Sequence, residues 1–494
     1  MPDAAAKPVV ARFCPSPTGN PHVGMARTAL FSWAFARHNR GRFVFRIEDT
    51  DTSRDTQESY ELLVDVMRWL GLDWDEGVEV GGPNGPYRQS ERMHIYADVG
   101  ERLKAGGFAY PCYCTPEELE ARRVRAREEG RPSGYDGTCR NLTAEQRAAN
   151  EAEGRSSVLR FKMPADDITF TDLVRGEITF NAENVQDYVL MRANGHPLYT
   201  LTNPTDDALM GITHVLRGED LLSSTPRQIA LYQAFAQIGV GDGTTPEFGH
   251  LPYVLGDGNR KLSKRDPESN LLGYRDDGFL PEGLLNYLAL LGWAISDDRD
   301  IFTLQEMVEA FEIDRVNPNP AKFDLKKCQA INGEHIRMLD GSDLTERLIP
   351  YLVADGLMDE PPTDEQRALL ADATPLVQER IGTLREGAAL LRFLFVADGD
   401  FSIDEKDRTK NLNESGQETA RAALEELQAV SRWDTDSIET ALRGRLIDQM
   451  GLKPRNAFGP VRVAVTGSRV SPPLFESLEL LGRQRALARL HAVI

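Results

Sequence analysis

The first seventy residues alternate strand-like and helix-like patterns, and this alternation restricts the fold more than any other feature of the chain. The apolar run at residues 9–13 is typical of a buried strand, and the prolines after it force a loop. Residues 24–39 and 62–70 have helical spacing, while residues 43–47 predict a second strand. Strands joined through helices run parallel in one sheet, so we expect an α/β fold with ligand sites at the carboxyl ends of the strands.

A chain of 494 residues is too long for one hydrophobic core, and its pattern changes twice. A charge-dense, turn-rich stretch with short β-like runs occupies residues 111–190. We predict that it is an α+β domain inserted between two parts of the α/β domain, 1–110 and 191–255. After about residue 323 the apolar spacing becomes persistently helical, which predicts a mostly α-helical last third of the chain. We place the start of this all-α part, 336–494, at residue 336, after a connecting region at 256–335.

No segment of the sequence predicts export or membrane insertion. The first ten residues lack a charged region followed by an apolar one, so we expect no secretory signal. The longest apolar segment, residues 284–295, is too short to span a bilayer. Five cysteines do not make a disulfide framework in a chain of this size, and a reducing compartment fits them best. We therefore expect a cytoplasmic protein without a membrane partner.

The overall charge balance argues against a nucleic-acid ligand. Lysine and arginine number 57, and aspartate and glutamate number 77, which gives a formal net charge of −20. Proteins that bind nucleic acid usually carry a basic excess. Because salt screens charges that lie more than about 10 Å apart, a local basic track on one face stays compatible with this total.

The loop after the first strand, PSPTGNPHVG, combines the features of an anion site. Its glycines and His22 come directly before a predicted helix. At a helix N-terminus, free backbone N–H groups and the positive end of the helix dipole attract phosphate. A loop histidine beside proline and glycine is also common as a turn residue, so His22 alone does not establish a site.

A second loop, NRKLSKRD at residues 259–266, concentrates positive charge. Lys261, Lys264 and Arg265 surround Ser263. Cations that meet a polyphosphate as it departs stabilise the transition state more than the ground state. A basic turn in solvent is the more common explanation of such a cluster, and only its combination with the first loop favours a phosphate site.

The two loops resemble the signature elements of the class I aminoacyl-tRNA synthetases. HVGM at residues 22–25 is similar to their HIGH element, and KLSKR at residues 261–265 is similar to their KMSKS element. With RIEDTD, YTLTN and HVLRGED between them, the ordered set resembles the glutamyl-tRNA synthetases over nearly the whole chain. The fourth HIGH position is Met25, which leaves His22 as the imidazole of the element, as in the variant found in that family.

This resemblance implies both a fold and a reaction. The fold is a Rossmann-type class I catalytic domain split by an acceptor-end-binding insertion, followed by a KMSKS-loop and stem-contact region and a helical anticodon-binding domain, at the boundaries given above. The reaction is the activation of L-glutamate with ATP to glutamyl-adenylate and pyrophosphate, and then transfer of glutamate to the 3′-terminal ribose of tRNA(Glu). Whether tRNA(Gln) is also charged stays open. A monomer is expected.

The resemblance also assigns the nucleotide site. His22, Lys261 and Lys264 are the implied catalytic residues, and Arg265 supports the departing pyrophosphate. Mg²⁺ accompanies the polyphosphate and keeps several waters and few protein ligands, so no metal-binding residues are expected for it. The implied ATP-binding positions are Pro15, Gly19, His22, Gly24, Asp220, Lys261, Ser263, Lys264 and Arg265.

Recognition of a side-chain carboxylate favours arginine, whose planar fork donates paired, charge-assisted hydrogen bonds. By resemblance, Arg12 and Arg217 meet that carboxylate and Glu48 faces the α-amino group. Glutamine would place a neutral amide before the arginine, at a cost of a few kcal/mol. The implied glutamate-binding positions are Arg12, Cys14, Ser16, Glu48, Tyr199, Asn203 and Arg217.

Two features of the predicted insertion leave alternatives open. Cys112, Cys114 and Cys139 resemble most of a zinc knot of the family, but Asn141 stands where some members have histidine. Tyr135 could complete a tetrahedral set, although phenolate is an unusual zinc ligand. A cluster of arginines could contact tRNA phosphates or form a solvated helix face. These arginines are Arg122, Arg123, Arg125, Arg127 and Arg131.

Three other functions share some of these features. A glutaminyl-tRNA synthetase is expected to end in β-barrels, whereas this chain predicts helices there, with Arg380 matching a family position near the third anticodon base. The glutamyl-queuosine tRNA ligase ends near the KMSKS loop, and this chain continues well beyond it. A non-catalytic tRNA-binding or regulatory paralogue has no need of a leaving-group loop.

Overall fold

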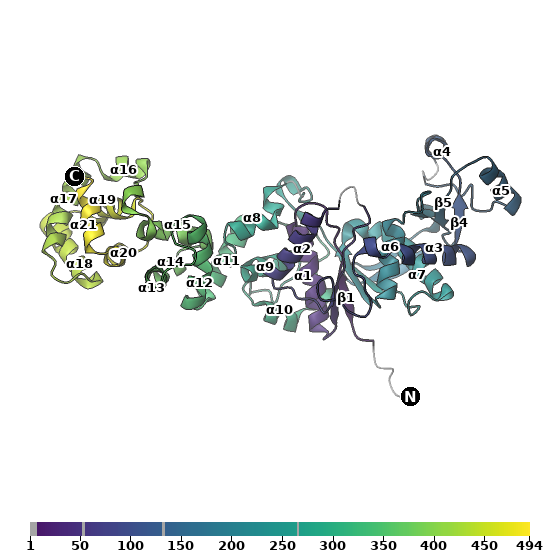
Figure 1. The fold of residues 1–494 in the computed structure, drawn as a ribbon, viewed down its shortest axis with the longest axis horizontal. Helices are drawn as coiled ribbons and strands as arrows, with labels where there is room; N and C mark the ends of the chain where they lie inside the picture. Colours follow the sequence, from purple (N-terminus) through teal and green to yellow (C-terminus); the bar gives the residue numbers. More distant parts are fainter. Residues whose placement is uncertain (1–6, 52–54, 131–133, 264–265) are drawn as a thin grey trace, which may run out of the picture. The chain divides into compact units, whose positions relative to one another are not determined.

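The molecule consists of two compact units with different secondary structure. The computed structural model describes residues 7–51, 55–130, 134–263 and 266–494. One unit comprises Met1–Leu272 with Leu285–Asp324, and the other comprises Gly273–Leu284 with Leu325–Ile494. All described strands belong to the first unit, and the second is built from helices (Figure 1). This arrangement confirms the predicted α/β fold followed by an all-α part, while the finer domain boundaries stay predictions.

The first unit is organised around one large sheet. Its described strands are β1 (Val10–Phe13), β2 (Arg42–Phe45), β3 (Glu76–Gly77), β4 (Ala109–Cys112), β5 (Val158–Phe161), β6 (Ile168–Asp172), β7 (Gly176–Phe180), β8 (Tyr188–Met191), β9 (His214–Gly218), β10 (Glu247–Leu251), β11 (Val254–Leu255) and β12 (Ala321–Lys322). Seven of them form a sheet in the order β3-β2-β1-β9-β10-β6-β7, parallel except for the edge hairpin β6–β7. The strand order reverses between β1 and β9, and ligands of such sheets bind at the carboxyl ends of the strands at that point.

The central strands are short and buried, as near-continuous apolar runs in a parallel sheet should be. β1 pairs with β2 from Val10 opposite Arg42 to Phe13 opposite Phe45. The rings of Phe13 and Phe45 stack with their centroids 5.6 Å apart. Burial of these two neighbouring rings fixes the register at the point where the chain leaves β1 for the proline-rich loop.

Helices cover both faces of this sheet. The helices that begin before residue 325 are α1 (Val23–His38), α2 (Gln57–Trp69), α3 (Met93–Ala105), α4 (Pro116–Glu128), α5 (Ala144–Ala152), α6 (Tyr199–Leu209), α7 (Thr225–Ile238), α8 (Leu271–Asp276), α9 (Pro281–Leu290) and α10 (Leu304–Ala310). Helix α1 packs against β1, β2, β9 and α10, whereas α3, α6 and α7 pack together on the other side of β1 (Figure 1). The site at the end of β1 therefore lies in a sheet that is shielded from water on both faces.

The segment predicted as an insertion, residues 111–190, contributes to two sheets. β4, β5 and β8 form a separate antiparallel sheet in that order. The hairpin β6–β7 instead joins the large sheet, because Asp172 at the end of β6 pairs with Phe248 of β10. This hairpin brings the end of β6 next to β10, so that β9 and β10 separate β6 from β1.

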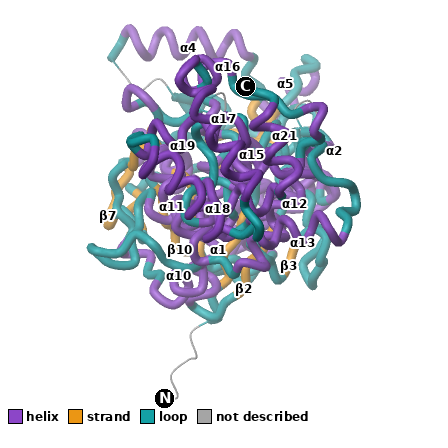
Figure 2. Tube along the Cα trace, turned by 90° about the vertical axis from the view of Figure 1, so that its left-hand side faces the viewer, coloured by secondary structure: helices purple, strands orange, loops and turns teal. Residues whose placement is uncertain are grey.

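The second unit contains helices and no strand, and all residues from 325 to 494 are described (Figure 2). Its helices are α11 (Leu325–Met338), α12 (Gly341–Ala354), α13 (Asp364–Ala373), α14 (Pro375–Gln378), α15 (Leu384–Phe395), α16 (Glu405–Asn411), α17 (Glu414–Ala429), α18 (Thr435–Leu442), α19 (Pro454–Thr466), α20 (Leu474–Leu481) and α21 (Arg483–His491). In α17 the residues Ala420, Ala423, Leu424 and Leu427 are buried, which is the one-sided spacing of an amphipathic helix. One hydrophobic core joins these helices.

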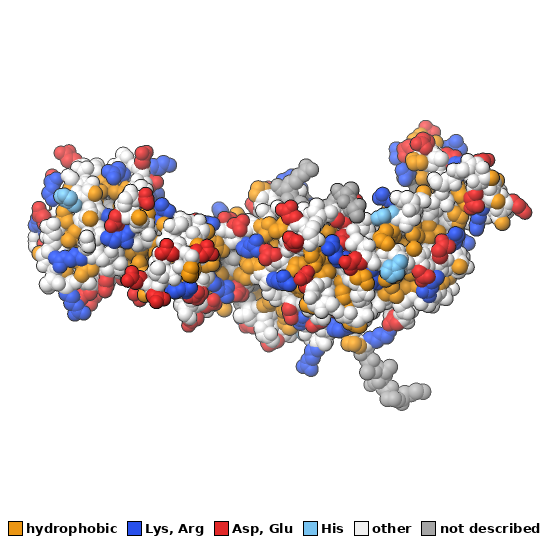
Figure 3. Space-filling model, viewed as in Figure 1, with side chains coloured by type: hydrophobic (Ala, Val, Ile, Leu, Met, Phe, Trp, Pro, Cys, Tyr) orange, Lys and Arg blue, Asp and Glu red, His pale blue; other side chains and the backbone are white. Residues whose placement is uncertain are grey.

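The surface charges are mixed in sign. On the face shown in Figure 3, lysines and arginines are interspersed with aspartates and glutamates over both units. The net charge of −20 is therefore spread out and does not form one acidic face in this view. In the described part of the chain, no helix is long and apolar enough to cross a membrane.

Candidate active site

A cavity of about 420 Å³ opens at the carboxyl ends of β1, β9 and β10. The loop after β1 and the first turn of α1 form one part of its lining. The last residues of β9 and β10 and the following loops form the other. This is the position that the reversal of strand order predicts for a ligand.

The cavity brings together most of the predicted site residues. Those in its lining are Arg12, Cys14, Pro15, Ser16, His22, Gly24, Glu48, Tyr199, Arg217, Asp220 and Lys261. Gly19, Asn203 and Ser263 are described but do not line it. Lys264 and Arg265 lie outside the described residues, so their positions stay predictions.

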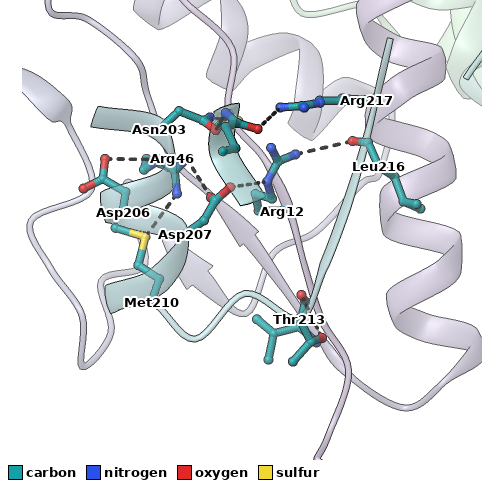
Figure 4. A network of polar contacts seen from close by, with 12 residues as sticks. Arg12, Arg46, Asn203, Asp206, Asp207, Met210, Thr213, Leu216 and Arg217 are labelled. Atoms are coloured by element: carbon teal, nitrogen blue, oxygen red, sulfur yellow. Dashed lines mark hydrogen bonds and ion pairs between the residues drawn. The ribbon is translucent and has the colours of Figure 1, made fainter. Parts of the chain in front are cut away.

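Arg12 is held in place by a buried carboxylate. Its Nε donates to Asp207 Oδ2 at 3.2 Å, and its Nη1 donates to the Leu216 carbonyl at 3.3 Å (Figure 4). Burial alone would lower the pKa of Arg12, but the charge of Asp207 raises it well above its usual range. Arg12 therefore stays charged at the end of β1, and the Asp207 carboxylate already balances part of its charge.

Arg217 has a different environment, since its described partners are neutral. Its Nη1 donates to Gln228 Oε1 at 2.7 Å, its Nη2 to Thr225 Oγ1 at 2.9 Å, and its Nε to His250 Nε2 at 3.1 Å. Two longer bonds run to Tyr199 Oη at 3.4 Å and the Leu221 carbonyl at 3.3 Å.

The three partners with shorter bonds to Arg217 stand behind the cavity wall, whereas both partners with longer bonds line the cavity. An entering carboxylate would thus compete with the two weakest bonds. It would also meet a cation that no described carboxylate neutralises.

Glu48 is fixed opposite these arginines. Asn203 Nδ2 donates to Glu48 Oε1 at 2.6 Å, and Arg46 Nη2 lies 3.3 Å from the same oxygen. Burial nevertheless raises the pKa of Glu48 above its usual value, more than Arg46 and Asn203 lower it. Asn203, predicted to touch glutamate, holds the Glu48 side chain from behind the lining.

Cys14 lines the same cavity as Arg12 and Glu48. Burial raises the pKa of its thiol to about 12, although Arg12 opposes this shift. The thiol therefore stays protonated near neutral pH and is a poor nucleophile.

A network of buried charges behind the site was not predicted from the sequence. Arg46 lies 2.9 Å from Asp207 Oδ1 and 3.6 Å from Asp206 Oδ2, and all three side chains are at most 1% exposed (Figure 4). Asp206 also accepts from Arg92 at 2.7 Å and from Tyr96 at 2.9 Å. The signal that could have found this network is the pair of adjacent acids in helix α6, whose other residues carry no charge.

His22 caps the helix that begins at the cavity. Its Nδ1 accepts from the Met25 backbone N–H at 3.2 Å, which stabilises the first turn of α1. Because Nδ1 accepts, the neutral ring carries its proton on Nε2, and that N–H is a donor. Together with the helix N-terminus, this donor suits a phosphate oxygen.

Lys261 faces the same cavity from the second predicted loop. Its Nζ lies 3.3 Å from Asp220 Oδ2 and 4.3 Å from the centre of the Tyr253 ring. The side chains of Lys261 and Asp220 are 55% and 52% exposed. Such an exposed pair is weak, so a polyanion could draw Lys261 away from Asp220.

Three cysteines form a cluster that could hold a metal ion. The Sγ atoms of Cys112, Cys114 and Cys139 all lie within 4.8 Å of one another, and no other such group occurs among the described residues. The Cys112 thiol donates to Tyr135 Oη at 3.4 Å. Three convergent thiols with a fourth oxygen fit a tetrahedral zinc ion by the type and number of donors. Asn141 is exposed and contributes no bond to the cluster.

None of the described residues predicted to contact tRNA lines this cavity. Arg125 and Arg127 on α4 are exposed, whereas Arg122 pairs with Asp136 and Arg123 pairs with Glu120. Arg131 lies outside the described residues. Arg380 is exposed directly after α14 in the helical unit.

Two families match successive parts of the chain. Residues 8–330 match the catalytic domain of the class I tRNA synthetases described as "E and Q". Residues 343–494 match an anticodon binding domain.

Full-length relatives have the same organisation. The chain is 61% identical to a glutamate–tRNA ligase of Nocardioides sp. over 488 residues, and this match covers 99% of each chain. It is also 62% identical to a glutamate–tRNA ligase of Saccharopolyspora erythraea over 484 residues. This match covers 98% of this chain and 96% of the other. A crystal structure of a glutamate tRNA ligase from Elizabethkingia meningosepticum, in complex with its amino acid, matches with a TM-score of 0.83 at 30% identity, covering 98% of this chain and 99% of that one.

Proposed function

The chain belongs to the class I tRNA synthetases for glutamate and glutamine, and we propose that, as a glutamate–tRNA ligase, it activates L-glutamate with ATP in the cavity at the ends of β1 and β9. One observation carries this assignment of the site. Two buried arginines, a helix N-terminus capped by His22, and Lys261 all line one cavity. An acidic amino acid and a polyphosphate need these groups side by side.

Arg217 is the group that selects the side-chain carboxylate of glutamate. Its neutral surroundings leave its positive charge for the substrate, and its planar fork can donate two hydrogen bonds to one carboxylate. Arg12, balanced by Asp207, adds a second donor at the same end of the cavity. Glutamine would leave Arg217 facing a neutral amide, which costs about 1.5–3 kcal/mol per lost charged hydrogen bond.

The substrate's α-ammonium group pairs with the Glu48 carboxylate. Glu48 is buried and held by Arg46 and Asn203, so its oxygens are fixed in direction. With the side-chain carboxylate and the α-ammonium group both fixed, the α-carboxylate on the same carbon as the ammonium group can point towards the phosphates.

The opposite end of the cavity binds the nucleotide. His22 Nε2–H and the start of α1 hold phosphate oxygens, and Lys261 leaves Asp220 to join them. Lys264 and Arg265, which lie outside the described residues, add charge in the same loop. Mg²⁺ accompanies ATP and neutralises part of the polyphosphate charge.

The activation step is then a displacement at the α-phosphorus of ATP. An oxygen of the glutamate α-carboxylate forms a bond to the α-phosphorus of ATP, and the bond from that phosphorus to the bridging oxygen breaks. Pyrophosphate leaves with the electron pair, and the cations of the loop stabilise the charge that develops on it. Glutamate is transferred afterwards to the 3′-terminal ribose of tRNA(Glu).

The helical unit binds the anticodon of the tRNA. Exposed Arg380 is placed there to contact an unpaired base or a phosphate. The absence of strands in residues 325–494, all of them described, disfavours the β-barrel ending of a glutaminyl-tRNA synthetase. Charging of tRNA(Gln) stays an open possibility, because it depends on anticodon contacts that no residue pattern here identifies.

A structural zinc ion in the insertion would be held by the cysteine cluster. Cys112, Cys114 and Cys139 would bind it as thiolates, and the Tyr135 hydroxyl lies 3.4 Å from the Cys112 sulfur. The ion would cross-link the start of the insertion to its middle and takes no part in the reaction. We further propose that the protein acts as a cytoplasmic monomer.

Amino-acid-dependent exchange of pyrophosphate into ATP, measured with tRNA present, tests the proposed activity. Exchange is expected with L-glutamate and not with aspartate or glutamine, because only glutamate carries a carboxylate at the distance of Arg217. Equal exchange with aspartate or glutamine would contradict the roles of Arg12 and Arg217. No exchange with any amino acid would instead favour the non-catalytic paralogue. Charging assays with purified tRNA(Glu) and tRNA(Gln) answer the remaining question of tRNA choice.

A further inference from the structure

Behind Arg217 lies a second buried pair, formed by His250 and Asp172. His250 Nδ1 and Asp172 Oδ2 are 2.5 Å apart, and both side chains are 0% exposed. Asp172 ends β6, the strand of the predicted insertion that joins the large sheet, and His250 lies on the neighbouring strand β10. Neither residue lines the cavity.

The Asp172 carboxylate is fixed in direction by the backbone. Its Oδ1 accepts from the N–H groups of Val174 and Arg175 at 3.0 Å and of His250 at 3.2 Å. Its Oδ2 is thereby aimed at His250 Nδ1. Burial would raise the pKa of Asp172, but the hydrogen bonds that it accepts from His250 and from the backbone lower it, so the carboxylate stays ionised.

An ionised carboxylate at this distance determines which nitrogen of His250 carries the proton. Nδ1 must donate to Asp172, and burial lowers the pKa of His250, so the ring stays neutral with a bare Nε2. Bare Nε2 accepts from Arg217 Nε at 3.1 Å and lies 3.1 Å from Thr225 Oγ1. The other tautomer would place an N–H against the N–H of Arg217.

We propose that Asp172 and His250 are positioning residues for glutamate selection: Asp172 sets the tautomer of His250, and His250 holds the Arg217 fork toward the substrate carboxylate. This inference rests on the proposed function, in which Arg217 binds that carboxylate. A neutral acceptor in this position orients the guanidinium without cancelling its charge. A carboxylate placed directly on Arg217 would compete with the substrate.

The contrast with Arg12 supports this division of labour. Arg12 contacts a carboxylate, Asp207, directly, whereas Arg217 reaches Asp172 only through an imidazole. The interposed ring keeps the negative charge one residue away from the cation that must attract glutamate. Arg217 then selects the glutamate carboxylate by its positive charge, while hydrogen bonds still fix the direction of its guanidinium group.

Asp172→Asn is the sharpest test. The amide keeps the shape of the side chain, and its oxygen can keep the three backbone hydrogen bonds. Its NH₂ then faces His250 Nδ1, which becomes an acceptor and moves the ring proton to Nε2. The KM for glutamate is expected to rise about 10- to 100-fold, with kcat and the KM for ATP changing less than about threefold.

Glu76→Gln is the matched control. Glu76 is also a carboxylate that is 2% exposed, and it lies on β3, at the opposite edge of the same sheet, away from the cavity. Its substitution is expected to leave the KM for glutamate within about twofold. Nitrogen-15 NMR of the histidine side chains gives a readout that a merely structural role would not move. The His250 Nε2 signal should change from a bare to a protonated nitrogen in Asp172→Asn only.

A glutamate KM that stays within about twofold in Asp172→Asn overturns the inference, as does an unchanged His250 tautomer. If Asp172→Asn does not fold, two variants of His250 replace it. His250→Gln keeps an acceptor for Arg217 and His250→Leu removes it, so the KM of the leucine variant should exceed that of the glutamine variant by about tenfold. Equal values would overturn the inference.

Arg217→Lys separates this inference from the function on which it rests. An unchanged glutamate KM in Arg217→Lys would contradict the role of Arg217 itself, and with it both proposals. A raised KM in Arg217→Lys beside an unchanged one in Asp172→Asn would contradict only the positioning role.

Discussion

The two ends of the active-site cavity are built in opposite ways. At the end proposed to bind glutamate, Arg12, Arg217 and Glu48 are buried, and each is held by hydrogen bonds from more than one element. At the phosphate end, Lys261 and Asp220 are more than half exposed and share one 3.3 Å contact. One end is fixed before the substrate arrives, and the other has a cation that is free to exchange partners.

This difference follows from what each end must do. Selection between glutamate and glutamine depends on a charge that is already in place, because any reorganisation would reduce the difference in binding free energy. Stabilisation of pyrophosphate is useful only while it departs, so cations there should bind more strongly in the transition state than before it. The comparison predicts that damage to the two ends will appear in different measurements.

Lys264→Ala should give the largest effect on the reaction. Removal of one cation from the leaving-group loop is expected to lower kcat by about 100-fold or more, because the charge on departing pyrophosphate loses a partner. Glutamate binding, measured by calorimetry, should stay unchanged, since the glutamate end does not depend on this loop. Lys104→Ala is the control, because Lys104 on α3 is exposed and its ion pair among the described residues is with Glu101 on the same helix.

Weakened glutamate binding with unchanged turnover in Lys264→Ala would contradict the leaving-group role. It would also remove the distinction between the two ends.

Asp206→Ala tests the rigidity of the glutamate end. Asp206 is fully buried and lies 2.7 Å from the guanidinium group of Arg92, which the substitution would leave without this ion pair, while Arg46 would keep Asp207 and Glu48. The free energy of unfolding of the first unit should fall by about 3–5 kcal/mol. Denaturation followed by tryptophan fluorescence measures this change, and Lys264→Ala should show none of it.

Asp98→Ala is the control for Asp206→Ala, because it removes an aspartate from an exposed ion pair. Asp98 is 66% exposed and pairs with Arg102 one helical turn away, so its loss should cost about 0.5 kcal/mol or less. Similar losses for Asp98→Ala and Asp206→Ala would mean that the buried charges do not stabilise the site.

The same contrast explains what the sequence could predict. The loop with His22 and the loop with Lys261 are local patterns, in which neighbours along the chain carry the chemistry. The place of the His22 loop at the end of a parallel strand also followed from the alternation of strands and helices. The lining of the cavity was therefore largely predictable, although Asn203 lies behind it rather than in it.

The supporting residues could not be predicted, because their partners are distant in the sequence. Asp207 meets Arg12 across 195 positions, and His250 meets Asp172 across 78. In the sequence Asp172 is one polar residue in an alternating strand, and nothing local shows that β6 joins the large sheet. Only the strand order brings it next to β10.

The pH dependence of binding gives the smallest expected effect and tests the glutamate end alone. Burial raises the pKa of Glu48, so in the free enzyme its carboxylate is protonated at a higher pH than an exposed glutamate would be. As pH falls from 7 to 5, the charged partner of the substrate's α-ammonium group is lost first, and the Kd for glutamate should rise about two- to fivefold. The Kd for ATP should stay level over the same range. Glu48→Gln should bind glutamate weakly at every pH and without this dependence, and a flat profile in the unmodified protein would mean that Glu48 does not carry the charge that meets the substrate.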